Sequence, residues 1–75
     1  MFSICIQLKN GRNYTNIMDR SFSREEYQGM KQSCRLVDGP VDPNTYGIYM
    51  VSIYANRYGC YLDSFMTFDD PTRYI

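Results

Sequence analysis

Cysteine and paired acidic side chains are the groups of this sequence that could act as nucleophiles, bases or metal ligands. The chain has three cysteines and no histidine. Cys34 falls on the apolar side of a predicted helix and Cys60 begins a predicted strand. Both positions are typical of small buried hydrophobes, whereas a reactive thiolate needs a partly exposed, electropositive setting. The adjacent carboxylates Asp69 and Asp70 precede Pro71, a pattern typical of a solvated turn. The sequence therefore predicts that the protein is not an enzyme.

The cysteines also argue against a metal centre and against disulfides. Cys5, Cys34 and Cys60 are widely separated and form no C-x-x-C pair. A zinc site needs about four nitrogen or sulfur ligands, and disulfide frameworks use an even number of cysteines. We therefore expect no metal, no cofactor and a reducing, cytoplasmic compartment. The apolar runs are shorter than the roughly 20 residues of a membrane span, and the N-terminal residues lack the features of a signal peptide.

The balance of charge indicates which class of partner the chain suits. Eight basic and eight acidic residues give a net charge of zero. Nucleic-acid binders usually carry a basic excess, because the neutralisation of phosphates drives most of their affinity. Six of the basic residues are arginines, which suit planar and specific contacts. Nucleic acid is therefore the less favoured partner.

The elements that must position these groups form one small α+β domain over residues 1–75, with a short tail from about residue 69. Strand-type composition and apolar–polar alternation predict four strands. These strands are Phe2–Lys9, Arg12–Met18, Gly47–Ala55 and Cys60–Phe68. Asn10-Gly11 is a strong signal for a two-residue hairpin turn. The four residues 56–59 end in glycine and suit a longer hairpin loop.

One helix is predicted over Arg24–Val37. It begins at the capping box of Ser23 and Glu26, and Asp38-Gly39-Pro40 stops it. The element order is therefore ββαββ, a four-stranded antiparallel sheet with one helix packed on one face. The predicted core consists of Ile4, Ile6, Leu8, Tyr27, Met30, Cys34, Tyr49, Val51, Ile53, Leu62 and Met66.

The second hairpin, residues 46–68, carries apolar residues on both faces. If Ala55 lies opposite Cys60, Val51 lies opposite Ser64 on the face turned to the helix. The other face then carries Tyr54 opposite Tyr61, and it also carries Met50, Phe65 and Asp63. A single helix covers only one face of a sheet, so this second face is left to solvent or to a partner.

The aromatic residues of the uncovered face predict a binding surface. Tyrosine, methionine, phenylalanine and arginine are enriched at protein interfaces, and a contiguous apolar patch indicates one. The predicted binding residues are Ile48, Met50, Tyr54, Arg57, Tyr61 and Phe65. We expect the partner to be a protein or a second copy of the chain, because Asp63 and Asp69 near the patch disfavour phosphate. Stacking of single-stranded nucleobases on the tyrosines is the alternative function. A purely structural cross-strand pair is the alternative role of Tyr54 and Tyr61.

The chain carries no family-specific motif. In its size, neutral charge, lack of catalytic groups and uncovered sheet face, the layout is similar to that of small phage proteins that occlude a host complex, anti-CRISPR proteins among them. A small housekeeping subunit or an antitoxin has the same layout. The sequence therefore predicts a small non-enzymatic protein-interaction module, with occlusion of a partner complex as the mode of action that this likeness implies.

Overall fold

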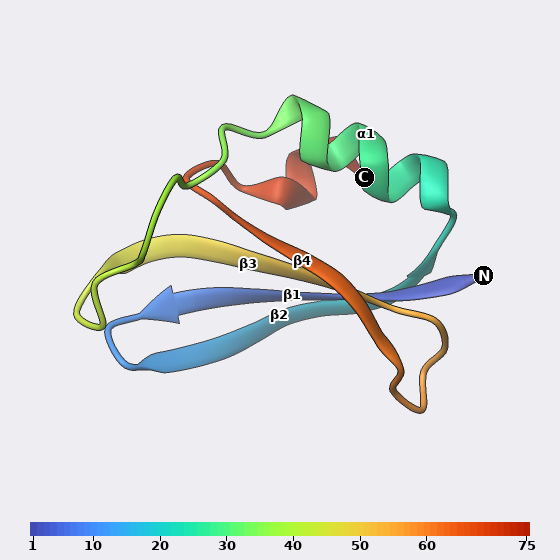
Figure 1. The fold of residues 1–75 in the computed structure, drawn as a ribbon, viewed down its shortest axis with the longest axis horizontal. Helices are drawn as coiled ribbons and strands as arrows, with labels where there is room; N and C mark the ends of the chain where they lie inside the picture. The colour runs from blue at the N-terminus through green and yellow to red at the C-terminus, as the bar shows by residue number, and fades with distance from the viewer.

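The computed structural model describes all 75 residues and has the α+β class and ββαββ order that the sequence predicts. Its strands are β1 (Phe2–Asn10), β2 (Asn13–Phe22), β3 (Tyr46–Tyr54) and β4 (Tyr61–Thr67), and its helices are α1 (Arg24–Ser33) and the short 3-10 helix η1 (Pro71–Tyr74). The strands form one antiparallel sheet in the order β2-β1-β3-β4. Helix α1 lies across one face of this sheet, with η1 on the same side (Figure 1). The opposite face is called the outer face below. Neither helix could span a lipid bilayer, since α1 has only 10 residues and η1 only 4.

The turn of the first hairpin lies one residue later than predicted. Asn10 pairs with Asn13, so Gly11 and Arg12 form the two-residue loop. Gly11 has a φ of 64°, and Arg12 has no positive φ. A positive φ at the first central residue alone is the requirement of a type II′ turn, which glycine meets without strain. The position of Gly11 therefore sets the register of the hairpin.

Strand β2 contains a β-bulge and is longer than the sequence predicts. The pairing shifts between Ile6 and Gln7, which leaves Ile17 as an extra residue. Beyond the bulge the strand continues to Phe22, whereas the prediction ends it at Met18. Phe22 is thereby brought under α1, where it is fully buried.

Helix α1 begins where the sequence predicts. The Glu26 amide donates to the Ser23 hydroxyl at 3.1 Å, and the Ser23 amide donates to the Glu26 carboxylate at 3.2 Å. These reciprocal bonds confirm the capping box. The helix ends at Ser33, however, and Cys34 is already extended, with φ −84° and ψ 147°.

The early end of the helix results from strand-like pairing along the edge of β4. The Val37 amide donates to the Met66 carbonyl at 2.8 Å, and the Phe68 amide donates to the Arg35 carbonyl at 3.1 Å. Leu36 forms an isolated antiparallel bridge with Thr67. The segment that was predicted to complete the helix therefore satisfies the backbone groups of an edge strand instead.

A second β-bulge, next to Tyr54, shifts the β3–β4 register from the predicted one. Val51 pairs with Phe65 rather than Ser64, and Tyr54 still pairs with Tyr61. One extra residue turns every later side chain of β4 to the other face. Phe65 therefore points toward α1, where it is 7% exposed, and the predicted position of Phe65 on the outer face is wrong.

The core lies between α1 and the sheet, as predicted. The predicted residues that are buried in its main cluster are Ile4, Ile6, Tyr27, Met30, Cys34, Val51 and Ile53. Phe22 and Phe65 complete this cluster. Leu8, Tyr49 and Met66 are only half-buried, and Leu62, next to the bulge, is 46% exposed. The prediction of these four as core residues is therefore wrong.

Candidate functional site

The outer face of the sheet is built by alternate residues of β1 and β3. Neighbouring side chains of a strand point to opposite faces. Ile4 and Ile6 point into the core, so the residues that alternate with them along β1 lie on the outer face. The cross-strand pairs of this face are Ser3 with Tyr54, Cys5 with Ser52, Gln7 with Met50, and Lys9 with Ile48. One end of the face is covered by the loop that precedes β3, and the other end is open.

The covered end is closed by the loop of residues 39–45. The Lys9 ammonium donates to the carbonyls of Gly11, Pro43 and Thr45, the latter two at 2.9 and 3.4 Å. Lys9 is only 4% exposed, and its β3 partner Ile48 is equally buried. Ile48 therefore does not lie on the exposed part of the outer face, where the sequence placed it. No pattern in the sequence indicates that this loop crosses to the outer side.

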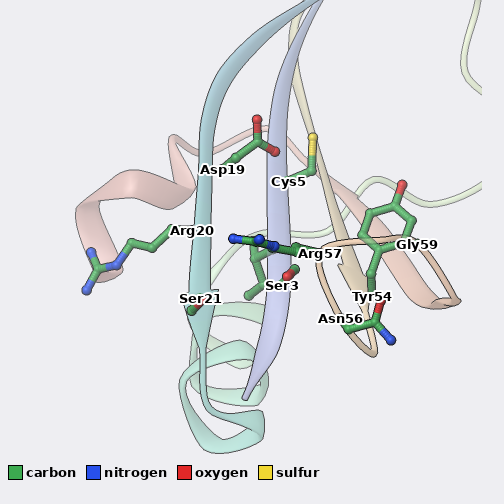
Figure 2. Close-up of a pocket in the computed structure, with 10 residues that line it drawn as sticks. Ser3, Cys5, Asp19, Arg20, Ser21, Tyr54, Asn56, Arg57 and Gly59 are labelled. Atoms are coloured by element: carbon green, nitrogen blue, oxygen red, sulfur yellow. The ribbon is translucent and has the colours of Figure 1, made fainter.

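The open end is hollowed by a groove with a volume of about 550 Å³. Its lining comes from β1, β2, the end of β3 and the β3–β4 turn, and includes Ser3, Cys5, Asp19, Ser21, Tyr54 and Arg57. Figure 1 shows that the β3–β4 turn curls away from α1, and so it rises beside the groove on the outer side. Figure 2 shows Arg57 extending over β1 near Ser3, and Asp19 beside Cys5.

An aromatic pair borders this groove. The rings of Tyr54 and Tyr61 are 6.0 Å apart and meet edge to face, which confirms the predicted cross-strand pair. The Tyr61 hydroxyl lies 2.9 Å from the Ser64 hydroxyl, and the two share a hydrogen bond. Tyr61 is nevertheless 60% exposed. Its ring is therefore fixed in orientation and open to a partner.

Opposite charges on the groove are not paired with each other. The ion pairs of the molecule join Lys31 to Asp63 at 3.1 Å and Arg35 to Asp69 at 3.9 Å. Arg57 instead donates to the Tyr58 hydroxyl at 2.9 Å and lies 5.1 Å from the centre of the Tyr58 ring. Asp19 and Arg57 thus present a carboxylate and a guanidinium that a ligand can contact.

Asp63 lies on the α1 side of the sheet, so its predicted place within the binding patch is wrong. Its carboxylate accepts hydrogen bonds from the Tyr27 hydroxyl at 2.7 Å and from the Lys31 ammonium at 3.1 Å. These bonds, led by that of Tyr27, hold the pKa of Asp63 below its ordinary value. The negative charge of the outer face comes from Asp19 instead.

The groove thiol of Cys5 stays protonated well above neutral pH. Burial is the main cause, and the hydrogen bond and negative charge of Asp19 add to it, raising the pKa of Cys5 from 9.0 to about 11. Because the thiolate is the reactive form of cysteine, Cys5 is a poor nucleophile at neutral pH. This arrangement offers no support for catalysis by the groove thiol.

The raised pKa of Cys5 predicts a pH dependence of stability. The thiol of the unfolded chain ionises near pH 9, while that of the folded chain stays protonated to about pH 11. The stabilisation linked to the protonated thiol is therefore complete below pH 9 and is lost as pH rises toward 11. We expect the free energy of unfolding, measured in urea, to fall less steeply over this range in Cys5→Ala than in the wild type. Parallel pH profiles for the two proteins would contradict the prediction.

The groove presents side chains that suit the binding of a ligand. Its side chains supply hydroxyls, the Asp19 carboxylate, the Arg57 guanidinium and a tyrosine ring, which can accept, donate and stack. Arg20 also lines the groove, but its side chain points away from the other lining side chains (Figure 2). The three cysteines are free, and no group of three potential metal-ligating side chains occurs. Of the predicted binding residues, Tyr61 and Arg57 are exposed here, and Met50 and Tyr54 are half-buried on the same face.

The sequence missed several groove residues from β1 and β2. Alternation along β1 does put Ser3 and Cys5 on the polar side, and that signal could have found them. Asp19 and Ser21 join the site only because β2 continues past its bulge.

Comparisons with protein-family models, with curated proteins and with solved structures found no match.

Proposed function

We propose that the protein is a non-enzymatic protein-interaction module that binds its partner through the open end of the outer face. The observation that carries this proposal is Tyr61, which is exposed while its ring and hydroxyl are held by Tyr54 and Ser64. A tyrosine fixed before binding loses little conformational freedom when it enters an interface. Such aromatic anchors supply a large share of the binding energy in protein complexes.

The surroundings of Tyr61 support the same function. Tyr54 and Arg57 line the groove at the open end of the outer face, and Met50 lies on the same face in the middle of β3. Residues of these types are enriched in interfaces. These four residues and the groove are called the recognition surface below. Groove hydroxyls, such as those of Ser3 and Ser21, offer hydrogen bonds around the aromatic centre.

Occlusion is the mode of action that this architecture suits. The two longest dimensions of the molecule are 34 and 25 Å. A standard protein interface buries about 800 Å² per partner, so an interface of that size would cover much of one side of so small a molecule. A module without catalytic groups that binds in this way acts by covering a surface of its partner. The proposal therefore includes inhibition: by covering its partner, the protein would block a larger complex, as the phage-type proteins of similar layout do.

We expect Tyr61→Ala to weaken partner binding about 30-fold, because loss of an interface anchor costs about 2 kcal/mol. The test is affinity capture from a lysate of the native cells by tagged wild-type and variant proteins, followed by a Kd measurement on the purified partner. Tyr46→Ala is the matched control, since Tyr46 is 72% exposed at the far end of β3. Equal losses in the two variants, or a loss only in Tyr46→Ala, would contradict the proposal.

Binding of single-stranded nucleic acid is the alternative function. Tyr58 and Tyr61 are exposed aromatic rings, and the Arg57 guanidinium lies beside Tyr58, an arrangement that can stack bases. The Asp19 carboxylate in the groove and the zero net charge disfavour it. We therefore expect no binding of a fluorescent single-stranded oligonucleotide at low salt, as measured by anisotropy. Tight binding that weakens steeply with added salt would favour the alternative.

A further inference from the structure

We propose that the partner at the recognition surface is a second copy of this chain. In the twofold dimer, the β3–β4 turn of each protomer enters the groove of the other, and Arg57 of one pairs with Asp19 of the other. The inference rests on the proposed function, because it names the occupant of the same surface.

A projection and a groove lie side by side on the outer face. The β3–β4 turn curls to the outer side of the sheet (Figure 1), and Tyr58 near its tip is 84% exposed. Asn56, Arg57 and Gly59 of this turn also form one wall of the groove. A twofold axis through the face would bring each turn onto the opposing groove. A self-complementary surface of this kind is the requirement of an isologous dimer.

The charges of the groove are complementary under the same symmetry. Asp19 is on β2 and Arg57 follows β3, so across the sheet the two positions are two strand spacings apart, roughly 10 Å. Neither side chain belongs to an ion pair within the protomer. An unrelated partner would have to supply both opposite charges at matching positions, whereas a second copy supplies them by symmetry. The zero net charge also removes long-range repulsion between copies.

The turn is held in shape before it binds. The Ala55 amide donates to the Cys60 carbonyl at 2.9 Å, and the Gly59 amide donates to the Asn56 carbonyl at 3.2 Å. The Asn56 side chain accepts from the Tyr58 amide at 2.9 Å. Because these bonds already order the turn, its insertion into a groove loses little conformational entropy.

Two charge-reversed variants test the reciprocal pairing. Arg57→Asp places two carboxylates against each other at both contacts of the dimer, and Asp19→Arg does the same with two cations. We expect each variant alone to raise the dimer dissociation constant at least 30-fold in sedimentation equilibrium, because apposed like charges cost several kcal/mol. In an equimolar mixture, the new aspartate of one variant faces the new arginine of the other. The original Arg57–Asp19 pair forms at the second contact, so the mixture should associate as a heterodimer.

Arg73→Asp is the control, because Arg73 is exposed on η1, which lies on the opposite side of the sheet. It should leave self-association unchanged, and circular dichroism should show that every variant is folded. A wild type that stays monomeric up to about 500 µM would overturn the dimer. Folded variants that self-associate like the wild type, or whose mixture fails to associate, would overturn it as well.

The same measurements separate this inference from the proposed function. A monomeric wild type that captures a cellular protein through Tyr61 would overturn the dimer and leave the proposed function standing. Restored association in the mixture would support the dimer even if Tyr61→Ala had no effect on the capture of any cellular protein.

Discussion

Phe65→Ala is expected to destabilise the fold by about 3–5 kcal/mol, the usual cost of removing a buried aromatic side chain. Phe65 is buried beneath α1, and its ring centre lies 5.7 Å from that of Tyr27. Small domains have total stabilities of about 5–15 kcal/mol, so this loss is a large fraction of the whole. Urea unfolding followed by circular dichroism measures it directly.

Leu62→Ala is the matched control for Phe65→Ala. Leu62 is exposed on the same strand, and its truncation should change the free energy of unfolding by less than about 1 kcal/mol. The register predicted from the sequence gives the opposite result, because it places Leu62 in the core and Phe65 on the outer face. A larger loss in Leu62→Ala than in Phe65→Ala would show that the bulge next to Tyr54 is absent.

Lys9→Met is expected to destabilise the fold by about 2–3 kcal/mol. Methionine keeps the apolar stem of lysine but removes the donors to the carbonyls of Gly11, Pro43 and Thr45. Each hydrogen bond to a charged group stabilises by roughly 1.5–3 kcal/mol, and the desolvation of the buried ammonium offsets part of the sum. Urea unfolding gives the loss of stability. Hydrogen exchange should show faster exchange in residues 39–45.

Lys31→Met serves as the control for Lys9→Met. The Lys31 side chain is 39% exposed in its ion pair with Asp63. Pairs at that exposure contribute about 0–1 kcal/mol, so the control should lose no more than that. An unfolding free energy unchanged by Lys9→Met would mean that the ammonium does not anchor the loop.

Local patterns in the sequence were sufficient to predict the elements. The alternation along residues 2–9, the Ser23–Glu26 capping box and the tyrosine-rich hairpin act within a few residues, and the structure confirms each. The bulges at Ile17 and next to Tyr54 could not be predicted, because an extra residue leaves little signal in composition or spacing. The one next to Tyr54 reversed the faces of Phe65 and Asp63. Long-range pairing with β4 likewise ended the helix before Val37.

The candidate site was predictable where it lies close to a turn. Tyr54 and Tyr61 flank the β3–β4 turn, so their pairing depends on few intervening residues. The burial of Ile48 depends on a loop that joins two distant elements, and no periodicity reveals that path. Asp19 enters the groove through the pairing of β2 with β1, which the first bulge obscured.

Hydroxyl-radical footprinting of the tyrosines tests the central claim most directly, namely that the open end of the outer face is the recognition surface. Oxidation rates are compared by mass spectrometry for the free protein and for the complex, formed either with captured partner or at high protein concentration. We predict strong protection of Tyr61 and Tyr58 in the complex and unchanged oxidation of Tyr46. Protection of Tyr46 with no change at Tyr61 would contradict the claim and place the interface at the other end of the sheet.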